Sequence, residues 1–124
     1  KDLLIITLGN MALEAEKAAR ILESKGIGCS LAPLANISPV PSEDLLGLLQ
    51  NFRLVFTLEA HCKNGGIGSL VAELIAERSI QCKLLRFGID RLPDGISGSQ
   101  EYLYDHHGLS AQHIVDQALK SIQK

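Results

Sequence analysis

A chain of 124 residues is long enough for one compact domain with a sizeable core, and we treat residues 1–124 as a single domain. Its hydrophobic share of 46% and charged share of 21% are those of a globular protein, which excludes a disordered chain. A net charge of −2 without any basic block argues against nucleic-acid or membrane-surface binding, and no apolar run approaches the roughly 20 residues of a membrane span.

The cysteines indicate a reducing compartment. Cys29, Cys62 and Cys82 are widely spaced, odd in number and form no C-x-x-C pair. This pattern is not a disulfide framework, and it predicts a cytoplasmic protein. The sequence begins at Lys1, directly in strand-like residues, so we expect it to be a piece of a longer protein.

Apolar and amphipathic stretches alternate along the chain. Leu3–Leu8 is a short apolar run that predicts a strand buried on both faces. From Met11 to Leu22 apolar residues recur at steps of three and four, which predicts a helix with Asn10 as its N-cap and Gly26 just past its end. The opposite face of this helix, which we expect to be exposed, carries Glu14, Lys17, Arg20 and Glu23.

The alternation continues to the end of the chain and predicts the fold class. Further strands are expected over Ile27–Leu34, Leu54–Leu58 and Ile80–Ile89. Further helices are expected over Pro41–Leu49, Ile67–Ile75 and Gln100–His107, and from the capping residue Ser110 to Ile122. Parallel neighbours need crossovers that cover the sheet, so we predict an α/β fold of three layers, α/β/α, with a mostly parallel sheet of four strands.

The loop between the third strand and its following helix, HCKNGGIGS, is rich in glycine. Gly65, Gly66 and Gly68 can adopt positive φ, and N–H groups near Ser69 at the start of a helix favour an anion. The loop is neither a P-loop nor a dinucleotide fingerprint, because no Gly-Lys-Ser/Thr follows and Val71 stands at the third glycine position. The alternative is that the glycines only turn the chain and let the helix pack closely.

Polar side chains also stand just before this loop and at its start, at the carboxyl end of the strand, where open α/β sheets bind ligands. Glu59 and His61 alternate along the strand and are expected to project on the same side. Cys62 could be a nucleophile near a helix N-terminus, but no supporting His with Asn or Asp is recognisable, and a half-buried thiol is the simpler interpretation. His106-His107 do not predict a metal site, because adjacent helical side chains point about 100° apart.

Several short motifs occur in an order typical of a known family. Leu58-Glu-Ala-His61, Gly65-Gly-Ile-Gly-Ser69 and Val71-Ala-Glu73 resemble the Glu-Glu-His, Gly-Gly-Leu-Gly-Ser and Val-Ala-Glu segments of the C-terminal domain of transketolase-like, thiamine-diphosphate-dependent enzymes. Other matching segments are Leu4–Gly9, Ala12–Ala19, Ile37–Pro41, Arg86–Asp90 and Gly98–Leu103. The chain departs from the family at Ala60, in loop 91–97, and in lacking the usual antiparallel first strand.

The resemblance implies a non-catalytic C-terminal domain of a transketolase-type enzyme, which transfers two-carbon ketol units between sugar phosphates. In such enzymes thiamine diphosphate and Mg²⁺ are held by other domains, so residues 1–124 should bind neither, contain no catalytic residue and be inactive alone. The expected partners are the other domains or subunit of the parent enzyme, in a homodimer. The resemblance places Glu59, His61, Gly65, Gly66, Gly68 and Ser69 at the edge of the substrate channel.

Two alternatives stay open. The parent could instead be a 2-oxo acid dehydrogenase β subunit or a deoxyxylulose-phosphate synthase, which share this domain. The chain could also be a free-standing α/β module that binds an anionic ligand or a protein.

Overall fold

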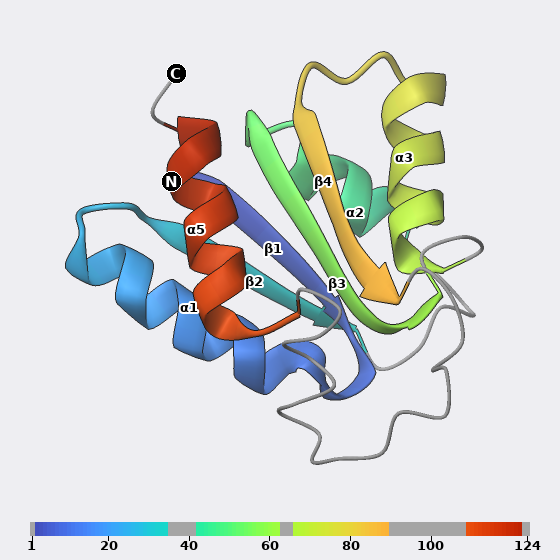
Figure 1. Ribbon diagram of the computed structural model, residues 1–124. Helices are drawn as coiled ribbons and strands as arrows, with labels where there is room; N and C mark the ends of the chain where they lie inside the picture. The colour runs from blue at the N-terminus through green and yellow to red at the C-terminus, as the bar shows by residue number, and fades with distance from the viewer. Residues whose placement is uncertain (1, 35–41, 63–65, 90–108, 123–124) are drawn as a thin grey trace.

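The computed structural model describes residues 2–34, 42–62, 66–89 and 109–122 (Figure 1). Its strands are β1 (Leu3–Leu8), β2 (Cys29–Leu34), β3 (Leu54–Cys62) and β4 (Lys83–Ile89). Its helices are α1 (Ala12–Ser24), preceded by a 3₁₀ turn over Gly9–Met11, then α2 (Ser42–Leu49), α3 (Ile67–Glu77) and α5 (Ala111–Ile122).

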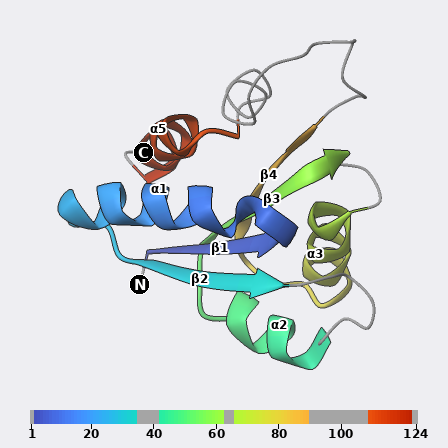
Figure 2. The ribbon, with the colours of Figure 1, turned by 90° about the horizontal axis from the view of Figure 1, so that it is seen from below.

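The four strands form one parallel sheet in the order β2-β1-β3-β4. Helices α1 and α5 cover one face of the sheet, and α2 and α3 cover the other (Figure 2). The predicted three-layer α/β/α fold with a parallel sheet is therefore confirmed. No helix in the described part of the chain is long and apolar enough to cross a membrane.

The core has two halves because β1 alternates its side chains between the two faces of the sheet. Leu3 and Ile5 belong to the apolar cluster under α1 and α5, while Leu4 and Ile6 belong to the cluster under α2 and α3. All six residues of β1 are buried, as expected for a central strand of a parallel sheet.

The end of α1 follows the sequence prediction, and its start does not. Gly26 has φ +85°, and the N–H groups of Gly26 and Ile27 donate to the carbonyls of Glu23 and Leu22, which is the bonding pattern of a Schellman motif. The predicted cap by Asn10 is wrong: α1 is preceded by the 3₁₀ turn, and its N-cap residue is Met11, without a side-chain hydrogen bond.

Strand β3 differs most from its predicted length. It extends to Cys62 rather than ending at Leu58, so Glu59 and the backbone of His61 lie within the strand, with an irregularity in its pairing to β4 between Leu58 and Cys62. Strands β2 and β4 begin later than predicted, at Cys29 and Lys83. The helix expected over residues 100–107, with His106-His107, lies outside the described residues.

Candidate functional site

The candidate site lies at the carboxyl edge of the sheet, where β3 leads into α3. Glu59 pairs with Leu8 in the sheet, and only 1% of its surface is exposed. A buried carboxylate needs partners, since leaving water without them costs several kcal/mol. The partners of Glu59 therefore define what this site is built to do.

Both oxygens of Glu59 bind the start of α3. The backbone N–H of Ile67 donates to Oε1 at 2.9 Å, and that of Gly68 donates to Oε2 at 2.9 Å. Gly66, the N-cap residue of α3, offers no side-chain bond of its own. The carboxylate of a strand residue thus caps the helix and lies at the positive end of its dipole.

This arrangement bears on the predicted anion site in the glycine loop. The two N–H groups that would cradle a phosphate at the start of α3 already bind an internal carboxylate. An incoming anion would have to displace Glu59 and leave its charge buried and unpaired. In the described part of the loop, Gly66–Ser69, the N–H groups of Ile67 and Gly68 are therefore already hydrogen-bonded to Glu59.

The glycines of the loop are needed for space and not for positive φ. A Cβ atom on Gly66, whose φ is −102°, would overlap the carboxylate of Glu59. Gly68 lies within α3, and a Cβ there would stand 2.9 Å from Cδ of Arg86 and 3.0 Å from Oγ1 of Thr57. Neither of these two glycines uses the positive φ that glycine can adopt, whereas close packing of the helix on the sheet is confirmed. Gly65 lies outside the described residues.

The other predicted site residues are placed only in part. Ser69 is half-buried in the first turn of α3. The backbones of His61 and Cys62 belong to β3, but their side chains lie outside the described residues. A common orientation of Glu59 and His61 therefore stays a prediction.

The described cysteines show no sign of an activated thiol. Cys29 is buried in the core. Burial also raises the pKa of the Cys82 thiol above its usual value, which keeps that thiol protonated at neutral pH.

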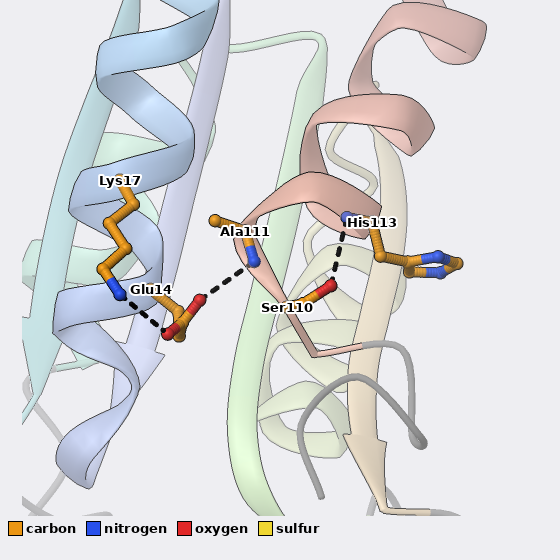
Figure 3. A network of polar contacts seen from close by, with 5 residues as sticks. All are labelled: Glu14, Lys17, Ser110, Ala111 and His113. Carbon is orange, nitrogen blue, oxygen red and sulfur yellow. Dashed lines mark hydrogen bonds and ion pairs between the residues drawn. The ribbon is translucent and has the colours of Figure 1, made fainter. Parts of the chain in front are cut away.

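A second carboxylate caps a helix, which the sequence pattern did not predict (Figure 3). Glu14, expected to be exposed, is 8% exposed, and its Oε2 accepts the N–H of Ala111 at 2.9 Å, at the start of α5. Nζ of Lys17 lies 3.5 Å from Oε1 of Glu14. Ser110 caps α5 as predicted, since its Oγ accepts the N–H of His113 at 3.3 Å.

Two helices that start at the carboxyl edge, α3 and α5, are therefore capped by buried glutamates from other elements. These are the buried carboxylates among the described residues, and both are engaged with backbone N–H groups. The arrangement can fix the edge rigidly and neutralise two helix dipoles. It leaves no buried carboxylate free for a metal ion in the described part of the chain.

Comparison with known proteins identifies the family. The sequence model described as "Transketolase, C-terminal domain" matches residues 1–114. The chain is 36% identical to a subunit of the apulose-4-phosphate transketolase of Actinobacillus succinogenes, over 93% of this chain and 37% of that protein. It is also 36% identical to 1-deoxy-D-xylulose-5-phosphate synthase of Rippkaea orientalis, over 96% of this chain and 19% of that protein.

A solved structure agrees. A split gene transketolase, described as an inactive β4 tetramer, superposes with a TM-score of 0.86 and 29% identity, over 99% of this chain and 40% of that one. The chain thus spans at most two fifths of the length of these relatives.

Proposed function

The chain belongs to the family of transketolase C-terminal domains, and from this membership we propose that it is the non-catalytic C-terminal domain of a transketolase-type enzyme. The parent enzyme transfers two-carbon ketol units between sugar phosphates. The domain stabilises the assembled enzyme and forms the outer edge of its substrate channel with the segment from Glu59 to Ser69.

The internally capped carboxyl edge is the observation that carries this proposal. A module that binds free anions would keep the N–H groups at the start of α3 open, whereas here Glu59 fills them. A sheet edge at which glutamates of the same chain neutralise the helix dipoles suits packing against another protein domain. This favours a domain of a larger enzyme over a free-standing anion-binding module.

We assign thiamine diphosphate and its Mg²⁺ to the rest of the parent enzyme. When bound there, thiamine diphosphate supplies the carbanion chemistry that moves the ketol unit. Mg²⁺ prefers several free carboxylate oxygens gathered in one place, and no three His, Cys, Asp or Glu side chains are gathered for a metal ion in the described part of the chain. Glu14 and Glu59 are both engaged with backbone N–H groups.

We further propose that the parent enzyme is cytoplasmic and forms a homodimer. The split gene transketolase that superposes on this chain forms a tetramer of its β chain, which supports self-association in this family.

A deoxyxylulose-phosphate synthase is the second candidate for the parent enzyme. The observation in its favour is the 36% identity to the synthase of Rippkaea orientalis, which equals the identity to the apulose-4-phosphate transketolase subunit. The product of the reaction distinguishes the two candidates.

The proposal is tested on the native protein. We would isolate it from its source with an antibody against this chain, then measure its intact mass and its content of thiamine diphosphate. A mass well above 13.4 kDa, or a tightly bound larger partner, together with thiamine diphosphate is the expected result. A single species of 13.4 kDa without thiamine diphosphate would favour the free-standing module.

His61 gives a test of the channel-edge role. In the parent enzyme we expect His61→Ala to lower turnover while the affinity for thiamine diphosphate stays unchanged, because His61 lies at the carboxyl end of β3, where we propose the channel edge. His113→Ala, which removes an exposed imidazole from α5, is the matched control. Unchanged kinetics for His61→Ala would show that His61 has no role at the channel edge.

A further inference from the structure

A group of positive side chains lies at the amino edge of the sheet, opposite the edge that carries the Glu59 cap. Arg53 directly precedes β3, Lys83 is the first residue of β4, and Arg78 is the C-cap residue of α3. The N–H of Lys83 donates to the carbonyl of Arg53 at 2.8 Å, so the two strand starts are neighbours. The end of α3 lies on the same side of the molecule, at the top of Figure 1.

These three cations have no partner within the described part of the chain. All three residues are exposed, and the ion pairs among the described residues are those of Lys17 with Glu14 and of Arg20 with Glu16, both on α1. Glu77, the exposed last residue of α3, adds one negative charge beside the three positive ones. Like charges on neighbouring strands repel each other, so this part of the edge keeps a positive charge that the domain itself does not neutralise.

Helix dipoles account for only part of this charge. A cation at the C-terminus of a helix is favoured by the negative end of the dipole, which explains Arg78. Arg53 and Lys83 stand at the starts of strands, outside the last turns of α2 and α3. The dipole of a helix therefore gives no reason for these two cations, and a partner outside the domain does.

The surroundings favour the carboxylates of a protein over a small anion. Small anions bind where backbone N–H groups gather, as at helix N-termini, whereas α2 and α3 end at this edge and present carbonyl groups. Arginine is enriched in protein interfaces and binds a carboxylate through two parallel hydrogen bonds. Ile80 and Cys82, both half-buried in the segment between α3 and β4, add apolar surface beside the cations.

From these features we propose that the amino edge at β3 and β4 packs against a carboxylate-rich surface of the parent enzyme, outside residues 1–124. Arg53 and Arg78 each bind a carboxylate through the guanidinium group, and Lys83 forms an ion pair with a further Asp or Glu. The inference rests on the proposed function, since its partner is the remainder of a transketolase-type enzyme. It adds an interface at the edge opposite to the segment Glu59–Ser69.

Carbodiimide cross-linking of the native full-length protein tests this interface. The reagent joins a lysine amine to a carboxylate that contacts it, and peptide mass spectrometry then identifies both residues. We expect Lys83 to be joined to an Asp or Glu outside residues 1–124, in the same chain or in a tightly bound subunit. Lys17 and Glu14, whose charged atoms are 3.5 Å apart, give the internal control for the reaction.

A double variant, Arg53→Gln with Arg78→Gln, tests whether the arginines share the contact. It removes two charges and leaves Lys83 free to react, so the yield of the Lys83 cross-link should fall at least about fivefold. Arg20→Gln, which changes an exposed arginine of α1, is the matched control and should leave the yield unchanged. An unchanged yield in the double variant would contradict a shared carboxylate-binding surface.

Other outcomes overturn the proposal. A cross-link from Lys83 only to carboxylates within residues 1–124, in the same copy or in an isotope-labelled second copy, contradicts the assigned partner. So does the absence of any Lys83 cross-link while Lys17 reacts with Glu14, and so does shielding of Lys83 from acetylation only when inorganic pyrophosphate is added. A protein that holds thiamine diphosphate but lacks the cross-link refutes only this inference, and one that shows the cross-link without thiamine diphosphate refutes only the proposed activity.

Discussion

At the scale of single residues, the carboxyl edge depends on the close fit between Glu59 and Gly66. The buried carboxylate binds two N–H groups of α3, and it can reach them only because Gly66 has no side chain in its path. Charge-assisted hydrogen bonds of this kind are about twice as strong as neutral ones. A small change at either residue should therefore have a large effect.

Replacing Gly66 by alanine should destabilise the domain by about 2–4 kcal/mol, since the new methyl group displaces the Glu59 carboxylate from both bonds. Urea unfolding followed by circular dichroism measures the change. Gly47→Ala is the control: Gly47 lies in α2 with open space around it, so alanine should stabilise the helix there by about 0.5–1 kcal/mol. Equal effects of the two substitutions would contradict a specific fit between Gly66 and Glu59.

Glu59→Gln preserves the shape of the side chain and removes its charge. The amide keeps one acceptor but turns an NH₂ group toward an N–H of α3, so we expect a loss of about 1–3 kcal/mol in the free energy of unfolding. Glu23→Gln, at an exposed position of α1, should change it by less than about 0.5 kcal/mol. An unchanged stability of Glu59→Gln would show that the charge does not matter.

At the scale of secondary-structure elements, Glu14 joins two helices that are far apart in the chain. It belongs to α1, and its carboxylate holds the first turn of α5, 97 residues away in sequence (Figure 3). The two helices pack side by side on the same face of the sheet. The contact therefore fixes where α5 begins.

Glu14→Ala should loosen this junction. We expect faster hydrogen exchange at the first amides of α5, and a loss of about 1–2 kcal/mol in overall stability, because the N–H of Ala111 loses its partner. Exchange measured by NMR would locate the effect. The amides of α3 serve as the internal control, since Glu59 caps that helix independently, and a uniform acceleration across both helices would contradict a local role.

The elements that can be predicted from sequence are those with local signals. The continuous apolar run of Leu3–Leu8 and the glycine after α1 are sufficient to predict β1 and the end of α1. The extension of β3 could not be predicted, because Glu59 is polar and is tolerated in a buried strand only through partners in α3.

The position of the candidate site in the chain could be predicted from the sequence, but the hydrogen bonding of its residues could not. The sequence points to Glu59 and the glycines, but their spacing does not reveal that the carboxylate turns inward to the helix. Glu14 also escapes prediction. Glu14 lies at the border of the apolar face of α1, three residues after Met11 and four before Ala18, so its spacing was a signal of burial that its charge outweighed, and α5 covers that border.

At the scale of the whole molecule, the features of the chain suit one part of a larger enzyme. It spans at most two fifths of the relatives compared above, and its carboxyl edge is closed by its own carboxylates. Catalysis by this domain alone is not expected. We propose that the protein carrying it transfers two-carbon ketol units between sugar phosphates.

The most direct test is a transfer assay with the native full-length protein. It would be supplied with Mg²⁺, a ketose phosphate as donor and an aldose phosphate as acceptor, with and without thiamine diphosphate, and the products would be identified by mass spectrometry. We expect an acceptor lengthened by two carbons, only when thiamine diphosphate is present. No lengthened acceptor, or 1-deoxyxylulose 5-phosphate as the only product under conditions that allow it, would contradict the claim.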